Sequence, residues 1–98
     1  MPLISVARFR VTDPRAAELA MFEHTTLVRR DHAAIVTTIY RNPEDPGVYT
    51  ALIMAHDAKA EARYRDVFTA ALAPHLAGTI AFEQSELVTS SDLQRRRR

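Results

Sequence analysis

Two apolar segments with the composition of β-strands, Ile35 to Tyr40 and Val48 to Ala55, follow one another in the middle of the chain. A segment with helical periodicity lies on either side of this pair, and a further strand-like segment lies at each end. The predicted order is therefore strand, helix, strand, strand, helix, strand, which is the split βαβ arrangement. This order constrains the fold strongly, whereas no metal, phosphate-loop or nucleophile motif points to a function.

The length and the charge distribution indicate one small domain with a basic tail. At 98 residues the chain has the size of a single domain, which we place at residues 1–90, followed by a tail at 91–98 that ends in four arginines. The formal net charge is +1, so the chain without those four arginines carries a net charge of −3. That balance predicts no nucleic-acid partner.

The sequence contains no cysteine, which excludes disulfides and thiolate chemistry and suits a cytoplasmic protein. No apolar run reaches the roughly 20 residues of a membrane span, and the N-terminus lacks the layout of a signal peptide. We therefore expect a cytoplasmic protein that does not contact a membrane.

Both predicted helices begin after an aspartate that can act as N-cap. Asp13 precedes Pro14, which fits the first position of a helix that runs to about Arg30. Asp57 precedes a second helix that ends before Pro74. Strands are predicted over residues 3–11, 34–41, 48–55 and 79–88, with a turn at 42–47 between the middle two.

Both middle strands are apolar on both faces, because hydrophobic residues occupy odd and even positions, as in Leu52, Ile53 and Met54. Two helices cover only one face of a sheet of this kind. Something else must cover the second face, and a second copy of the sheet is the simplest candidate. We therefore predict a homodimer.

The segments Ile4 to Val11, Tyr40 to Tyr49 and Asp66 to Leu72 resemble the antibiotic biosynthesis monooxygenase family, and the resemblance extends over residues 3–88. It implies an α+β fold, a ferredoxin-like βαββαβ unit with a four-stranded antiparallel sheet and two helices on one face. In this family two such units pair sheet to sheet into a dimeric α+β barrel. Some members oxygenate polyketide-derived phenols without metal or flavin, and others degrade haem.

The positions that carry haem degradation in this family hold other residues here. The asparagine of the first strand corresponds to Ala7, and the haem-ligating histidine of the second helix corresponds to Leu72. The tryptophan early in that helix corresponds to Tyr64 or Ala62. The resemblance therefore argues against haem as a ligand.

His24 lies on the apolar stripe of the first helix and is the candidate general base, since histidine exchanges a proton near neutral pH. The resemblance implies that Tyr64 contacts the substrate, and Arg8 could hold an anionic group of the substrate. Each residue has a structural alternative: a buried core histidine, a core aromatic, and a charge that discourages strand pairing.

Tyr40, His56 and Phe82 complete the predicted site as residues that contact a small-molecule substrate. Tyr40 is the other aromatic that survives from the family's site, His56 stands beside Asp57, and Phe82 lies in the last predicted strand. The histidines occur at positions 24, 32, 56 and 75, without the helical spacing of metal ligands. We predict neither a metal nor another cofactor.

Three functions are consistent with the sequence. The first is a cofactor-independent monooxygenase that takes a proton from an aromatic or enolisable small molecule before reaction with dioxygen. The second is a dimeric binding or accessory protein without turnover. The third is a tautomerase-like isomerase that uses Pro2 as base, because the start Met1-Pro2-Leu3-Ile4 resembles the tautomerase superfamily.

Overall fold

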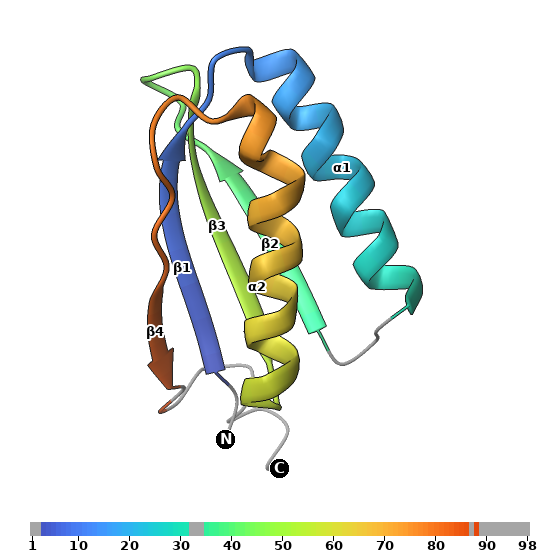
Figure 1. Cartoon of the computed structure of the whole chain (residues 1–98). Helices are drawn as coiled ribbons and strands as arrows, with labels where there is room; N and C mark the ends of the chain where they lie inside the picture. Colours follow the sequence, from blue (N-terminus) through green and yellow to red (C-terminus); the bar gives the residue numbers. More distant parts are fainter. Residues whose placement is uncertain (1–2, 32–34, 87, 89–98) are drawn as a thin grey trace, which may run out of the picture.

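The computed structural model describes residues 3–31, 35–86 and 88 and has the predicted order of elements. Its strands form one antiparallel sheet in the order β2-β3-β1-β4, and both helices lie on the same face of that sheet (Figure 1). This is the ferredoxin-like α+β fold that the sequence predicts. The elements are β1 (Leu3–Arg10), α1 (Pro14–Asp31), β2 (Ile35–Arg41), β3 (Val48–Ala55), α2 (Ala58–Leu72), a 3₁₀ turn (Ala73–His75) and β4 (Glu83–Glu86).

Local sequence determines where both helices begin. Asp13 Oδ1 accepts a hydrogen bond from the backbone N of Arg15 at 3.1 Å, and Asp57 Oδ1 accepts one from the backbone N of Lys59 at 2.8 Å. At the other end of α2, Pro74 lies in the 3₁₀ turn that follows the helix. The predicted aspartate caps and the predicted end of α2 are confirmed.

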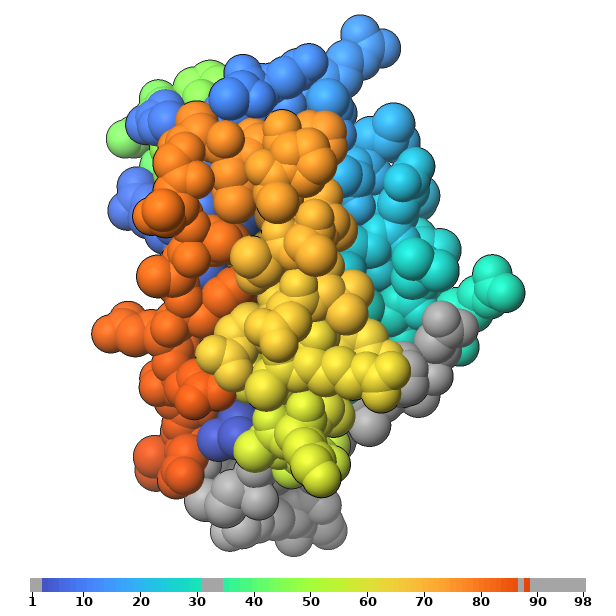
Figure 2. Space-filling view, in the orientation of Figure 1, coloured from blue at the N-terminus to red at the C-terminus, as the bar shows by residue number. Residues whose placement is uncertain are grey.

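The hydrophobic core lies between the sheet and the two helices. Alternate residues of β1 and β3 point to the helix side, and Phe9, Ala51 and Ile53 are buried there. Phe68 and Leu72 of α2 belong to the same core. Figure 2 shows α1 and α2 next to each other over this face. One chain therefore covers the helix side of its sheet by itself.

The other face of the sheet is open in the single chain. Val36, Tyr40 and Met54 point to this face and are 47%, 57% and 38% exposed. Ile4 and Leu52 lie on the same face and are half-buried. No described element of the chain covers these side chains, so the homodimer stays a prediction.

The last strand is shorter than the sequence predicted. β4 covers Glu83–Glu86, whereas a strand was predicted over residues 79–88. The segment before β4 is fixed by Ala77, whose backbone N donates to the carbonyl O of Arg10 at 2.8 Å. The Ile80 side chain then packs against the hydrophobic core, and the backbone pairs with β1 from Glu83 onward. Side-chain burial therefore replaces strand pairing over the first half of the predicted segment.

Some predictions fall outside the residues that the structure describes. The basic tail at 91–98 and Pro2 lie there, as does Ala34 at the predicted start of the second strand. Within the described part of the chain, no helix is both long and apolar enough to span a bilayer.

Candidate functional site

His24, the predicted base, lies on the buried side of α1. It is 4% exposed, and its ring meets the Phe68 ring edge-on at a centroid distance of 5.1 Å. Its Nε2 atom is buried and has no hydrogen-bond partner among the described residues. Burial lowers the pKa of His24, because a buried imidazolium loses its hydration. The imidazole is therefore neutral at physiological pH and keeps one nitrogen without a partner in the described part of the chain.

Two other predicted site residues lie on the same side of the sheet as His24. The Phe82 ring meets Phe68 edge-on at 6.0 Å, so Phe68 contacts both His24 and Phe82. Tyr64 is half-buried and packs against the same hydrophobic core. The structure thus brings three predicted residues to the helix side of the sheet.

The remaining predicted residues lie elsewhere. Arg8 and Tyr40 are exposed on the open face. Thr50 of β3 lies between them, because it pairs with Arg8 of β1 on one side and with Tyr40 of β2 on the other. His56 is exposed just after β3. The sheet therefore separates Arg8 and Tyr40 from His24 within one chain.

Glu61, in the first turn of α2, is fully buried. It accepts hydrogen bonds from the Ser5 hydroxyl and, at 2.9 Å, from Gln84 Nε2, and its Oε1 lies 3.4 Å from Arg65 Nε. Ser5 and Gln84 stand opposite each other on β1 and β4. We refer to these four residues as the Glu61 cluster, which ties α2 to one pair of strands.

Glu18 connects α1 to the other pair of strands. It accepts hydrogen bonds from the Tyr49 hydroxyl at 2.5 Å and from Arg41 Nε at 3.0 Å, and Arg41 and Tyr49 stand opposite each other on β2 and β3. The pKa of Glu18 is lowered, mainly by the hydrogen bond from Arg41 and to a smaller extent by the one from Tyr49. The pKa of Tyr49 is raised, mainly by burial and to a smaller extent by its hydrogen bond to Glu18. At neutral pH this Glu18 cluster therefore holds a carboxylate, a guanidinium and a protonated phenol.

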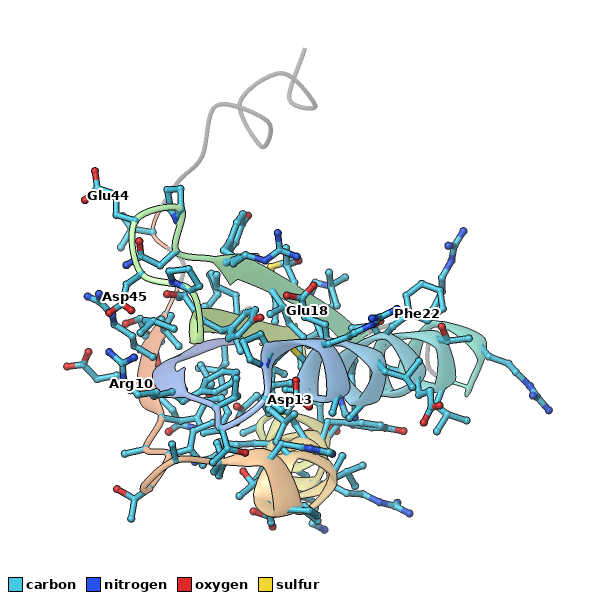
Figure 3. The ribbon with its side chains drawn as sticks, turned by 90° about the horizontal axis from the view of Figure 1, so that it is seen from above. Arg10, Asp13, Glu18, Phe22, Glu44 and Asp45 are labelled. Carbon is cyan, nitrogen blue, oxygen red and sulfur yellow. The ribbon has the colours of Figure 1, made fainter. Side chains whose placement is uncertain are left out.

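A groove runs between α1 and β2, and Figure 3 shows Glu18 and Phe22 on this side of α1. It consists of two adjoining cavities of about 550 and 370 Å³, which share Phe22, Thr25 and Thr37. The Glu18 cluster lines the smaller cavity. Cavities of this size are typical of small-molecule sites, so the groove is a candidate ligand site that no sequence motif predicted.

Neither cluster has a clear signal in the sequence. Glu18 and Glu61 are two of twelve acidic residues, and the strand residues that bind them lie 23 to 56 positions away. The spacing of Glu61 and Arg65 by four residues is the only local hint. Among the described residues, no three His, Asp or Glu side chains gather as a possible metal site.

Comparison with known proteins shows where the fold occurs. No family model and no curated protein matches the sequence. Solved structures named as candidate antibiotic biosynthesis monooxygenases, and that of a cofactor-independent oxygenase, do match over most of their length. The chain therefore has the fold of that family, and the resemblance seen in the sequence is confirmed at the level of the fold.

Three of these structures illustrate the likeness. A candidate antibiotic biosynthesis monooxygenase from Caulobacter crescentus is 22% identical, with a TM-score of 0.73 over 90% of this chain and 91% of that chain. SnoaB from Streptomyces nogalater, a cofactor-independent oxygenase, is 18% identical, with a TM-score of 0.75 over 92% of this chain and 96% of that chain. A candidate family protein from Nitrosomonas europaea is 14% identical, with a TM-score of 0.76 over 89% and 90% of the two chains.

Proposed function

We propose that this chain is an oxygenase that acts on an aromatic or enolisable small molecule without a cofactor. The observation that carries the proposal is His24, a neutral and buried imidazole whose Nε2 has no partner among the described residues. Its neighbour Phe68 supplies an aromatic surface beside it. The fold that the chain shares with SnoaB, a cofactor-independent oxygenase, supports the same reading.

In the proposed reaction, the core opens beside Phe68 to admit the substrate, and His24 Nε2, which is buried in the closed chain, removes a phenolic or enolic proton from it. The resulting carbanion reacts directly with dioxygen, one oxygen atom enters the product as a carbonyl group, and the other leaves as water. Tyr64 and Phe82 orient the substrate ring, and the apolar surroundings exclude water from the reactive carbanion. Arg8, Tyr40 and His56 stay predictions, and the first two would act at the open face of the sheet.

The test is oxygen uptake by the purified protein with a panel of quinols and naphthols. We expect uptake with at least one phenol and a rate about 100-fold lower in His24→Gln, which is the lower end of what a general base contributes. His75→Gln is the matched control, because His75 lies beyond α2 and takes no part in the proposal. Ligand binding without oxygen uptake would instead favour a binding or accessory protein, and an unchanged rate in His24→Gln would exclude His24 as the base.

We also propose that two copies pair through the open faces of their sheets. Val36, Tyr40 and Met54 form an exposed apolar surface there, which a second sheet would cover. Leu52→Asp should convert a dimer into a monomer in sedimentation experiments, because it introduces a charge in the middle of that face. Val67→Asp, on the exposed side of α2, should leave the dimer intact. A wild-type protein that sediments as a monomer would contradict the proposal.

A further inference from the structure

The groove between α1 and β2 has apolar walls that remain open to solvent. Phe22 borders it and is 70% exposed although its side chain is apolar, whereas Val36 borders it at the edge of β2 and directs its side chain to the open face of the sheet. Met21 and Val28 belong to the buried core and line the two cavities from the inside. Exposed apolar side chains around a cavity favour binding of an apolar body.

The groove also contains a hydroxyl group without a partner. Thr37 lines both cavities, and its Oγ1 is buried and makes no hydrogen bond to the described residues. Thr25 and Thr26 line the groove as well, but both donate their hydroxyls to the carbonyl O of Phe22. Because buried polar atoms are almost always hydrogen-bonded, Thr37 marks a point where a molecule in the groove completes the bond.

The Glu18 cluster offers both an acceptor and donors at one end of the groove. The side chains of Glu18 and Arg41 are 36% and 61% exposed. A carboxylate has about four acceptor positions, so Glu18 can accept a further hydrogen bond beside those from Arg41 and Tyr49. Arg41 uses Nε and one terminal nitrogen on Glu18, and its guanidinium carries further N–H donors.

The charges of this cluster select a neutral polar group. Glu18 and Arg41 carry opposite charges side by side, so one ionic group on a ligand meets attraction and repulsion that nearly cancel, while it still loses hydration on entering the groove. A hydroxyl group can donate to Glu18 and accept from Arg41 at the same time. The cluster therefore favours a hydroxyl group over an ionic group of either sign.

We propose that the groove between α1 and β2 binds a molecule with an apolar body and a neutral hydroxyl group, with the hydroxyl between Thr37 and the Glu18 cluster and the body along Phe22. This site does not include His24, which faces Phe68 in the core and lines neither cavity. The inference is therefore independent of the proposed oxygenase activity.

The test uses three probes that share a ring and a chain and differ in their polar group: phenylpropanol, phenylpropionate and phenylpropylamine. Each is titrated into the labelled protein while amide and methyl NMR resonances are recorded. We expect phenylpropanol to shift the resonances of Thr25, Thr37 and Ile39 and to bind roughly tenfold more tightly than either charged probe. Equal binding of the three probes, or the absence of shifts at these residues with any probe, would overturn the proposal.

Variants of the groove sharpen the test. Glu18→Gln removes the negative charge and leaves Arg41, so phenylpropionate should then bind more tightly than phenylpropanol. Thr37→Val should weaken binding of phenylpropanol about threefold or more, because one hydrogen bond is lost. The matched control is Thr79→Val, at an exposed position outside the groove, which should bind as the wild type does. A Glu18→Gln variant with unchanged selectivity would also overturn the proposal.

Discussion

Glu18 and Glu61 occupy corresponding places in the two halves of the molecule, but in opposite environments. Each lies near the start of its helix. Each also accepts hydrogen bonds from a pair of residues that face each other across two neighbouring strands, β1 and β4 for Glu61 and β3 and β2 for Glu18. Glu61 is fully buried by its cluster, whereas the Glu18 side chain is 36% exposed and lines a groove. A glutamate therefore connects helix and sheet in both halves, but solvent reaches only the carboxylate of Glu18.

The strand residues of the two clusters differ in size. Ser5 is small and fully buried, and its hydroxyl donates to the equally buried Glu61 carboxylate. Tyr49 and Arg41 have long side chains that donate to Glu18, and all three residues line the groove between α1 and β2. We infer that the Glu61 cluster mainly stabilises the fold, while the Glu18 cluster is accessible to ligands.

The largest expected effect is the difference in protein stability between variants that remove Glu61 and variants that remove Glu18. Glu61→Ala should lower the free energy of unfolding by about 3 kcal/mol, because the buried Ser5 hydroxyl loses its acceptor and a fully buried side chain is removed. Glu18→Ala should cost less than about 1 kcal/mol, since solvent can replace an exposed partner. Urea denaturation followed by circular dichroism measures both values at one protein concentration. Equal losses in the two variants would contradict the difference that we infer.

Short-range features of this molecule could be predicted from the sequence, because their causes lie within a few residues. Asp13 and Asp57 cap their helices through backbone groups only two residues away. The spacing of apolar residues along α1 likewise predicted that His24 would be on the stripe that faces the core. The order of the elements followed from such local patterns, and with it the fold.

The candidate site depends on which residues face each other across the sheet, and local patterns do not fix that. Ser5 and Glu61 are 56 positions apart, and their hydrogen bond requires both the register of β1 and the placement of α2. Likewise, Glu18 reaches Tyr49 only because α1 crosses the strands at that point. The length of β4 also depends on contacts between distant residues, because burial of Ile80 in the core competes with pairing of the same segment to β1.

A second prediction compares the hydroxyl donors of the two clusters. Ser5→Ala should lower the free energy of unfolding by about 2 kcal/mol, because the buried Glu61 carboxylate loses a donor that water cannot replace. Tyr49→Phe keeps the buried ring and removes a hydroxyl beside a partly exposed carboxylate, so it should cost about 1 kcal/mol or less. The same urea experiment measures both, and a larger loss for Tyr49→Phe would reverse the comparison.

A third prediction uses His24, a buried ionisable group on α1. Burial lowers the pKa of His24 in the folded state. As the pH falls below about 6.5, His24 is therefore protonated in the unfolded chain before it is protonated in the folded chain. Stability should therefore fall by up to about 1.4 kcal/mol per pH unit below that value, until the folded histidine also becomes protonated. Unfolding free energies between pH 5 and 8 measure this slope. His24→Gln should remove it and His75→Gln should retain it; an unchanged slope in His24→Gln would contradict the assignment.

The smallest expected effect concerns the pH dependence of the Glu18 cluster. The pKa of Glu18 is lowered from about 4.5 in the folded state, so its contribution to stability is present above that value and is lost as the pH falls through the folded pKa. The difference in unfolding free energy between wild type and Glu18→Gln should be below about 1 kcal/mol at pH 7, because the side chain is exposed. It should shrink toward zero as the carboxylate becomes protonated, and Glu23→Gln on the same helix corrects for the loss of one charge. If the difference instead grew with acidity, Glu18 would not be held by Arg41 and Tyr49 as a carboxylate, and the groove would lack its charged acceptor.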